Sequence, residues 1–125
     1  MLFRSVVRRL AGFSLLVGVS TTNLAQARAA ATSGADYCGV GPMFPTTTKH
    51  KPTLSGPGYL REYLADEKTA RVPHLAIGGI TPETVGALVE AGCKGVAVSS
   101  AVCAAPDPAE ACRVLLSAIS GRRTS

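Results

Sequence analysis

The residues of this 125-residue sequence best suited to chemistry are hydroxyl side chains, a lysine and paired glycines, each group placed directly after an apolar stretch. They fall into four segments: Ser20, Thr21 and Thr22; residues 41–49, which include Thr46, Thr47, Thr48 and Lys49; Gly78 and Gly79 before Thr81; and Ser99 with Ser100. None of these segments contains a carboxylate, so acid–base chemistry by Asp or Glu is not expected there. Hydroxyls, backbone amides and a lysine are groups that bind anions such as phosphate.

The third and fourth segments together predict a phosphate site. A Gly-Gly pair lets backbone N–H groups approach a ligand closely, and Ser99 and Ser100 add hydroxyl donors after the next apolar run. Taken singly, the glycines could simply form a tight turn and the serines could simply cap a helix. Their occurrence at the ends of two successive strands favours phosphate binding.

The second segment predicts a site for another anionic group. Three successive threonines precede Lys49 in a stretch with several prolines, and a lysine ammonium is a point charge suited to a phosphate or diphosphate oxygen. A plain polar loop is the alternative.

These segments need strands that end beside one another, and four strand-then-helix units supply them. The strands are expected at residues 15–19, 35–40, 74–77 and 95–99. The helices are expected at residues 24–32, at 59–67, between a cap at Thr81 and a stop at Gly92, and from a cap at Asp107 to Gly121. This alternation predicts an α/β fold with a parallel sheet, whose strands carry ligands at their carboxyl ends. The pattern alone leaves a doubly wound sheet and a barrel equally open.

Composition excludes several other classes of protein. Hydrophobic residues make up 46% and charged residues 17%, with 13 Gly and 8 Pro, which is unlike a coiled coil, a disordered tail or a collagen-like fibre. The absence of Trp and the 5% aromatic content predict a core of Val, Ile, Leu and Ala. Although the net charge is +5, no basic stripe with interleaved aromatic residues is present, so nucleic-acid binding is not expected.

Cysteine and histidine give no metal-site pattern. Cys38, Cys93, Cys103 and Cys112 form no CxxC pair, so we expect reduced thiols that act as small hydrophobic side chains, which favours a cytoplasmic location. His50 and His74 lack the spacing of a metal-binding pair, and His74 is expected to be structural.

The first 19 residues allow a second interpretation. Arginines in residues 1–9, an apolar run over residues 10–19 and small residues near position 27 are similar to a targeting peptide. Glycines and a serine interrupt the apolar run, which also fits a buried strand. No run reaches the roughly 18 apolar residues that a membrane-spanning helix needs.

The motifs together resemble the thiamine-phosphate synthase family. The resemblance rests on residues 17–21 (VGVST), 39–49 (GVGPMFPTTTK), 76–81 (AIGGIT) and 95–101 (GVAVSSA), and it extends over about residues 7–119, with residues 120–125 as a polar tail. It implies a TIM (β/α)8 barrel that joins a pyrimidine diphosphate to a thiazole phosphate, with loss of diphosphate assisted by Mg²⁺. No nucleic-acid or membrane partner is implied.

The resemblance also implies roles for individual residues. Thr46, Thr47, Thr48, Gly78, Ser99 and Ser100 match the thiazole-phosphate site, and Ser20 and Lys49 match ligands of the pyrimidine diphosphate. No catalytic residue is assigned. The family's metal ligands lie in the preceding half of the barrel, so none is assigned in this chain, and residues 1–125 are expected to form about four βα units: a half-barrel not competent for turnover alone.

Two alternatives remain. A thiazole tautomerase would share the fold and the phosphate site, but the family usually has His where this chain has Thr22. A non-catalytic, phosphate-binding half-barrel is the second alternative. Unpaired strand edges and an exposed apolar face would favour self-association of such a half-barrel.

Overall fold

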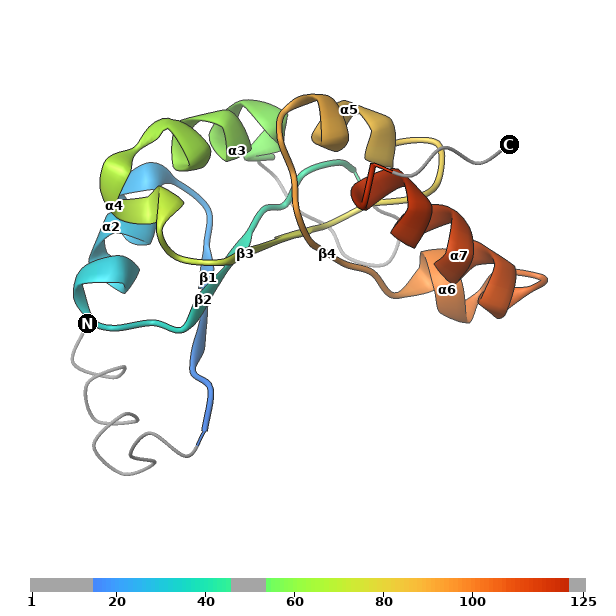
Figure 1. Ribbon diagram of the computed structural model, residues 1–125, viewed down its shortest axis with the longest axis horizontal. Helices are drawn as coiled ribbons and strands as arrows, with labels where there is room; N and C mark the ends of the chain where they lie inside the picture. Colours follow the sequence, from blue (N-terminus) through green and yellow to red (C-terminus); the bar gives the residue numbers. More distant parts are fainter. Residues whose placement is uncertain (1–14, 46–53, 122–125) are drawn as a thin grey trace.

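The computed structural model describes residues 15–45 and 54–121. In these residues a four-stranded parallel sheet has the strand order β1-β2-β3-β4, which is also the order along the chain (Figure 1). The strands are β1 (Gly18–Thr21), β2 (Tyr37–Val40), β3 (His74–Ile77) and β4 (Val96–Ala97). The helices are α2 (Leu24–Thr32), α3 (Gly56–Ala65), α4 (Glu67–Ala70), α5 (Val85–Glu90), α6 (Ser100–Cys103) and α7 (Pro108–Ile119).

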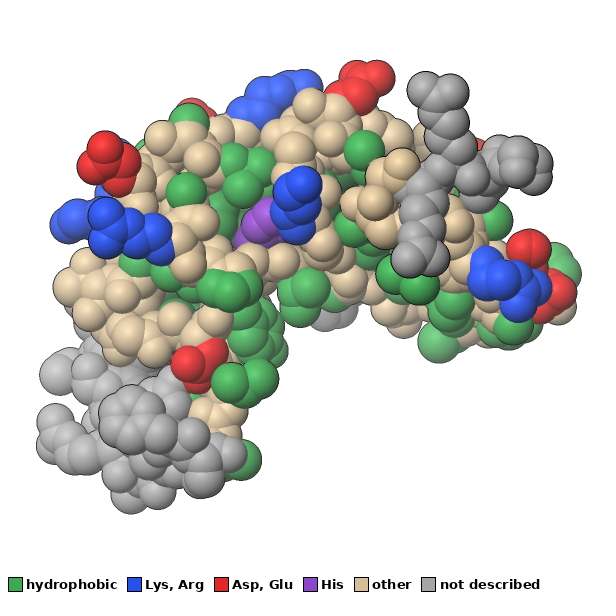
Figure 2. Space-filling view, viewed as in Figure 1, with side chains coloured by type: hydrophobic (Ala, Val, Ile, Leu, Met, Phe, Trp, Pro, Cys, Tyr) green, Lys and Arg blue, Asp and Glu red, His purple; other side chains and the backbone are tan. Residues whose placement is uncertain are grey.

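The helices lie along one side of the strands, so the sheet has a covered face and an open face. Helices α2 to α5 arch over one side, while α6 and α7 lie beyond β4 (Figure 1). The space-filling view shows the opposite side hollowed, with hydrophobic side chains along the hollow (Figure 2). This is half of the arrangement of a (β/α)8 barrel, in which helices surround the strands and the open face points inward. These four strands form an open sheet and do not close a barrel by themselves.

The core lies between the helices and the covered face. Alternate residues of each strand point to it, and Cys38, Val40 and Ala76 are fully buried against the helices. From the helical side, α3 contributes Tyr59, Leu60 and Tyr63. Two of these three are aromatic, so the predicted core of small aliphatic residues was incomplete.

The helix over residues 24–32 and the strand over residues 74–77 are confirmed with the predicted bounds. The side chain of Asn23 accepts a hydrogen bond from the N–H of Gln26 and begins α2, and Gly34, with φ +85°, follows its end. Asp107 caps α7 by accepting from the N–H of Glu110, as predicted. The Thr81 hydroxyl accepts from the Thr84 N–H at 3.2 Å, but regular α-helix starts only at Val85.

The first strand begins at Gly18, three residues later than predicted. Residues 15–17 are apolar but lie outside the strand, and Leu16 is 80% exposed because no described helix covers it. The strand instead continues through Ser20 and Thr21, which were expected to follow it. Thr21 is accommodated there because its hydroxyl donates to the carbonyl of Gly39 at 2.8 Å and contacts the Tyr59 hydroxyl at 2.5 Å.

The other boundaries shift for local reasons. The second strand begins at Tyr37 rather than residue 35, and the fourth contracts from residues 95–99 to Val96–Ala97, because in the described sheet it pairs only with β3. The helix predicted over residues 59–67 begins at Gly56 and breaks at Asp66, which caps the separate helix α4. Helix α6 was not predicted. Within the described residues, no helix has both the length and the apolar character that crossing a bilayer requires.

Candidate functional site: the carboxyl edge of the sheet

Strand register places the described site residues Ser20, Gly78 and Ser99 toward the carboxyl ends of the parallel strands, which together are called the carboxyl edge of the sheet. Ser20 pairs with Gly39, which pairs with Leu75, so these three residues form a row across the open face. Gly78 follows the end of β3, and Ser99 lies two residues after the end of β4, the neighbouring strand. At about 3.3 Å per residue, Gly78 lies roughly 10 Å beyond the row that contains Ser20.

Ser20 is exposed on the open face, and its hydroxyl is left uncovered by its neighbour. Gly39 has no side chain, and a Cβ built there would lie 3.8 Å from the Ser20 hydroxyl oxygen. A Cβ at position 39 would thus make only an ordinary van der Waals contact with this hydroxyl. The position of Ser20 is compatible with its predicted contact to an anionic ligand.

The Gly78–Gly79 turn has a stringent steric requirement for glycine. Both residues have positive φ, +103° and +65°, and both lie against the segment that follows β2. A Cβ on Gly78 would lie 2.9 Å from the Cα of Pro42, and a Cβ on Gly79 would lie 2.6 Å from the carbonyl oxygen of Phe44. Close approach of two chain segments therefore explains the glycine pair, whether or not a phosphate also binds there.

Hydrogen bonds connect these two segments along their length. The N–H of Met43 donates to the carbonyl of Ile77, and the N–H of Phe44 donates to the carbonyl of Gly78, both at 3.0 Å. The turn after β3 and the connection after β2, which begins with a cis Gly41–Pro42 peptide bond, consequently form one unit. The sequence motifs at residues 41–45 and 78–79 were predicted as separate loops.

Ser99 and Ser100 lie where β4 leads into α6. Both are exposed, and Ser99 occupies the N-cap position without a side-chain hydrogen bond to that helix. Its backbone carbonyl accepts from the N–H groups of Val102 and Cys103. The structure thus places both hydroxyl-bearing residues at the predicted strand end, next to the Gly78–Gly79 turn.

Four predicted site residues fall outside the described part of the chain. These are Thr46, Thr47, Thr48 and Lys49. Their predicted roles in binding thiazole phosphate and pyrimidine diphosphate therefore remain predictions. The described residues on either side, Pro45 and Leu54, belong to the connection between β2 and α3.

Thr22, at the position where the resembling family usually has His, faces the start of α2. Its backbone N–H and its hydroxyl both donate to the side-chain oxygen of Gln26, at 2.7 and 3.0 Å. Thr22 is exposed. Its hydroxyl contributes to the turn before α2 and supplies none of the acid–base capacity of an imidazole.

Tyr59 is a contact at this edge that sequence reasoning missed. Tyr59 was expected only as the start of an amphipathic helix, yet its hydroxyl reaches Thr21, directly after Ser20. Burial raises the pKa of the Tyr59 phenol, so it stays protonated at neutral pH. The pattern of apolar residues in a helix does not reveal where a tyrosine hydroxyl makes its hydrogen bond.

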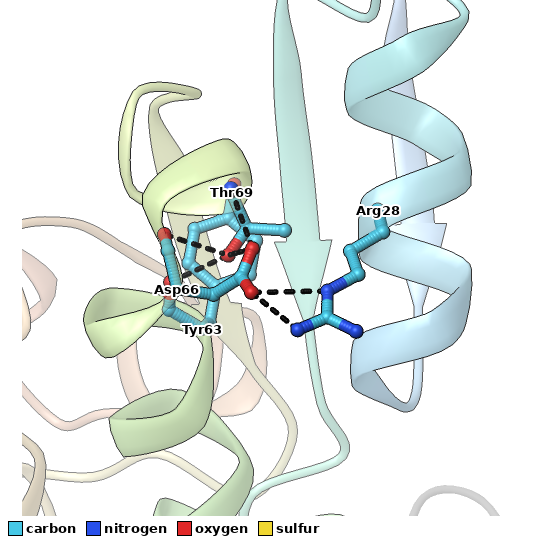
Figure 3. Close-up of polar contacts among 4 residues, drawn as sticks. All are labelled: Arg28, Tyr63, Asp66 and Thr69. Atoms are coloured by element: carbon cyan, nitrogen blue, oxygen red, sulfur yellow. Dashed lines mark hydrogen bonds and ion pairs between the residues drawn. The ribbon is translucent and has the colours of Figure 1, made fainter.

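A second polar cluster belongs to the helical layer and not to this edge. The Arg28 guanidinium in α2 bonds the carboxylate of Asp66, and Asp66 also accepts from the N–H of Thr69 (Figure 3). The Thr69 hydroxyl in turn donates to the carbonyl of Tyr63. The hydrogen bond from Arg28 lowers the pKa of the Asp66 carboxyl. These contacts fasten α2 to the junction of α3 and α4.

His74 has the structural role that was expected. Its ring is buried at the start of β3, packs edge-on against Tyr63, and accepts a hydrogen bond through Nε2 from the Lys94 N–H at 3.1 Å. Burial, followed by the nearby charge of Lys94, lowers the pKa of His74. The ring is therefore neutral at pH 7 and carries its proton on Nδ1.

The cysteines meet the expectation only in part. Cys38 and Cys93 are buried as small hydrophobic residues, whereas Cys103 and Cys112 are exposed on α6 and α7. Helix α7 presents Cys112 near an apolar pocket of about 370 Å³ between β4 and α7, which Leu75, Leu115 and Leu116 help to line. This pocket is not at the predicted phosphate site.

The described residues do not fit a Mg²⁺ site. Mg²⁺ requires oxygen ligands, chiefly carboxylates. Across residues 15–45 and 54–121, no group of three or more His, Cys, Asp or Glu side chains is arranged to hold a metal ion. Ser20, Gly78, Ser99 and Ser100 offer hydroxyls and backbone amides, which suit an anion better than a cation.

Comparison with known proteins identifies a family and agrees with the fold. Residues 2–102 match the protein family described as thiamine monophosphate synthase. The chain is 45% identical over 105 residues to the thiamine-phosphate synthase of Geobacillus thermodenitrificans, covering 83% of this chain and 47% of that protein. It is 48% identical over 109 residues to that of Synechococcus sp. strain WH7803, covering 87% of this chain and 30% of that protein.

A solved structure extends the similarity to three dimensions. The thiamine phosphate pyrophosphorylase from Pyrococcus furiosus superimposes with a TM-score of 0.80 at 31% identity, covering 94% of this chain and 55% of that one. The structure titled "Native KDPGal structure", at 24% identity and a TM-score of 0.69, shares the fold. The chain spans about half or less of the length of these relatives.

Proposed function

Because this chain belongs to the thiamine monophosphate synthase family, we propose that residues 1–125 form part of one domain of a thiamine-phosphate synthase and carry its thiazole-phosphate site. The reaction joins 4-amino-2-methyl-5-(diphosphooxymethyl)pyrimidine to thiazole phosphate and gives thiamine phosphate and diphosphate. It is a transfer of an alkyl group. The enzyme class follows from the family. The proposal concerns the part of the binding site that these residues contribute.

The observation that carries the proposal is the shared edge of β1, β3 and β4. Ser20, the Gly78–Gly79 turn and Ser99 follow the register of one parallel sheet. Hydroxyl and amide donors at the carboxyl ends of adjacent strands are the usual phosphate site of this kind of fold. Lys49 and the three threonines of residues 46–48 would complete it, with Lys49 and Ser20 toward the diphosphate.

These residues bind and stabilise charge and do not transfer protons. In the proposed reaction the C–O bond between the pyrimidine methylene and the diphosphate breaks, and its electron pair leaves with the diphosphate. The thiazole nitrogen then donates its lone pair to the methylene carbon and forms the C–N bond. Donors aimed at the phosphate hold the thiazole nitrogen near the carbon that it attacks. Mg²⁺, which the family implies, has no set of ligands among the described residues, and no step is assigned to it.

Calorimetry and a turnover assay test this proposal. We expect thiazole phosphate to bind the purified 125-residue chain and the dephosphorylated thiazole alcohol to bind at least tenfold more weakly, because the phosphate provides the charge that the site recognises. We expect no thiamine phosphate from this polypeptide alone with both substrates and Mg²⁺. Robust thiamine-phosphate formation would contradict the proposal that these residues carry only part of the active site. Equal affinity for the two thiazoles would contradict the phosphate site.

We also propose that the polypeptide self-associates through its open face. Leu75 and Ile77 lie on this face, and Ile77 is 47% exposed. A second copy related by a twofold axis along the strands would bring β4 beside β1 with both strands parallel. Light scattering after size exclusion tests this, and a clean monomer at micromolar concentration would contradict it.

A cytoplasmic location is proposed as well. The exposed thiols of Cys103 and Cys112 support it, since an oxidising compartment favours pairing of exposed thiols. Amino-terminal sequencing of cellular protein tests it, and removal of the first residues, as in a targeting peptide, would contradict it.

A further inference from the structure

Ser55 connects three backbone segments near the carboxyl ends of β1 and β2. Its hydroxyl lies 2.7 Å from the carbonyl oxygen of Thr22 and 2.9 Å from that of Gly41. Its backbone N–H and that of Gly56 both donate to the carbonyl of Pro42, at 2.9 and 3.1 Å. One residue therefore contacts the end of β1, the end of β2 and the start of α3.

The hydroxyl of Ser55 is not used as its position in the sequence would suggest. Ser55 occupies the N-cap of α3, where a serine ordinarily accepts a hydrogen bond from an N–H of its own helix. No such bond is formed, and Pro57 occupies the first turn, where it has no N–H to donate. The Ser55 hydroxyl is instead directed at carbonyl groups from two other segments of the chain.

A second contact, one turn later in α3, fixes the same helix to the same strands. The Tyr59 hydroxyl contacts Thr21, whose hydroxyl donates to the carbonyl of Gly39. Tyr59 and Thr21 are 4% and 2% exposed. Because this buried contact anchors α3 independently, loss of the Ser55 hydroxyl should release the strand ends without releasing the helix.

The contacts of Ser55 extend to the predicted phosphate turn. Pro42, which accepts from Ser55, is followed by Met43 and Phe44, whose N–H groups bond the carbonyls of Ile77 and Gly78. A continuous chain of hydrogen bonds thus runs from Thr22, through Ser55 and the segment after β2, to Gly78. Within this chain of contacts, the side chain of Ser55 joins the residue after β1 to the segment after β2.

From this geometry we propose that Ser55 is a positioning residue: it sets the end of β1 against the segment after β2 and thereby holds the Gly78–Gly79 turn in its ligand-binding position. What binds at that turn rests on the function proposed above. Ser55 itself is not expected to touch the ligand, because its hydroxyl is already shared between two carbonyls.

The test compares Ser55→Ala with Ser120→Ala in the full 125-residue chain. Ser120 is a matched control because its hydroxyl also donates to a backbone carbonyl, that of Ser117, but does so at the end of α7. Amide hydrogen exchange of Met43, Phe44 and Gly56 is measured by NMR. A hydrogen bond worth about 1 kcal/mol corresponds to roughly fivefold faster exchange in Ser55→Ala, with core amides such as Ala76 unchanged.

Two further variants separate positioning from general stability. Ser55→Cys keeps the size but is a weaker donor, so its exchange should lie between those of wild type and Ser55→Ala, and Ser55→Thr should restore protection. Thiazole-phosphate affinity should fall about threefold to tenfold in Ser55→Ala and should stay at the wild-type value in Ser120→Ala.

Several results would overturn the proposal. Unchanged exchange at Met43 and Phe44 in Ser55→Ala would do so, as would equal acceleration at Ala76 or the same pattern in Ser120→Ala. If wild type fails to bind thiazole phosphate, the function proposed above fails, and the exchange data still decide whether Ser55 positions the turn. Local acceleration with unchanged affinity would show that ligand binding at the turn does not depend on Ser55, and would overturn the proposed positioning role.

Discussion

The two faces of this sheet are made from alternate residues of the same strands, yet only one of them is buried by helices of this chain. On the covered face Cys38, Val40 and Ala76 are fully buried by helices of this chain. On the open face Tyr37 is 36% and Ile77 is 47% exposed. One face thus packs into a hydrophobic core, and the other presents partly exposed apolar side chains.

The comparison explains why the binding edge can form in a chain that spans about half of its relatives' length. The residues that fix the strand ends belong to the covered side, where Thr21 and Tyr59 are buried. The side chain expected to meet ligand, Ser20, belongs to the open side. Side chains on the covered face therefore fix the strand ends, and a side chain on the open face is available to bind the ligand.

The largest expected effect is the loss in free energy of unfolding at the covered face, compared with an exposed position on α7. Leu60→Ala removes a fully buried side chain beneath the helices and should lower it by about 2–5 kcal/mol. Leu116→Ala removes a side chain that is 68% exposed and should change it by less than about 0.5 kcal/mol. Urea unfolding followed by circular dichroism measures both, and similar losses would mean that Leu116 is buried in solution.

Glycine substitutions test the contact between the two loops. Gly78→Ala should destabilise the chain by about 2–3 kcal/mol, since a methyl group meets Pro42 in a backbone conformation that already disfavours alanine. Gly34→Ala is the matched control, because its φ of +85° gives the same conformational cost with open space around the Cβ. Its loss should be about 1–2 kcal/mol, and equal losses in the two variants would show that the loops separate in solution.

The covered face should also make stability depend on pH through His74. Burial lowers the pKa of this ring below its unfolded value of about 6.5, so the unfolded chain binds the proton more readily. Stability is therefore complete above about pH 6.5 and falls as the pH drops through that value, by at most about 1.4 kcal/mol per pH unit. Urea unfolding at pH 7.5 and 5.5 measures the difference between wild type and His74→Gln, and an equal dependence in both would contradict this assignment.

The smallest effect on stability is expected on the open face. Ile77→Thr keeps a β-branched residue in β3 and should change the free energy of unfolding by less than about 0.5 kcal/mol. It should nevertheless weaken self-association if the open face is the contact, because it removes apolar surface there. Sedimentation velocity over a range of concentrations measures this, and a large loss of stability without any change in association would reverse the interpretation of this face.

Much of the covered side could be predicted from the sequence. The helix from Leu24 to Thr32 has a capping Asn23 before it and Gly34 after it, and these local signals act within a few residues. Asp107 marks the start of α7 in the same way. The four strands in parallel order follow from the strand–helix alternation, and the placement of Gly78 and Ser99 at one edge follows from that order.

The rest depends on contacts between residues far apart in the sequence. Leu15 and Leu16 look like strand residues, but hydrogen-bond pairing with β2 decides where β1 begins. Ser55 looks like a helix cap, and only the meeting of three segments shows where its hydroxyl goes. Asp66, which caps α4 locally, also bonds Arg28, 38 residues away, and this contact has no local signal in the sequence. The roles of residues 46–49 stay predictions of sequence alone.

The central claim is that the carboxyl ends of β3 and β4 bind the phosphate of a thiazole phosphate. An NMR titration of the ¹⁵N-labelled chain tests this most directly, with the dephosphorylated thiazole alcohol as the control ligand. The account predicts saturable shifts of the Gly78, Gly79, Ser99 and Ser100 amides with the phosphate ester alone. Shifts confined to the apolar pocket beside α7, or identical shifts with the alcohol, would contradict it.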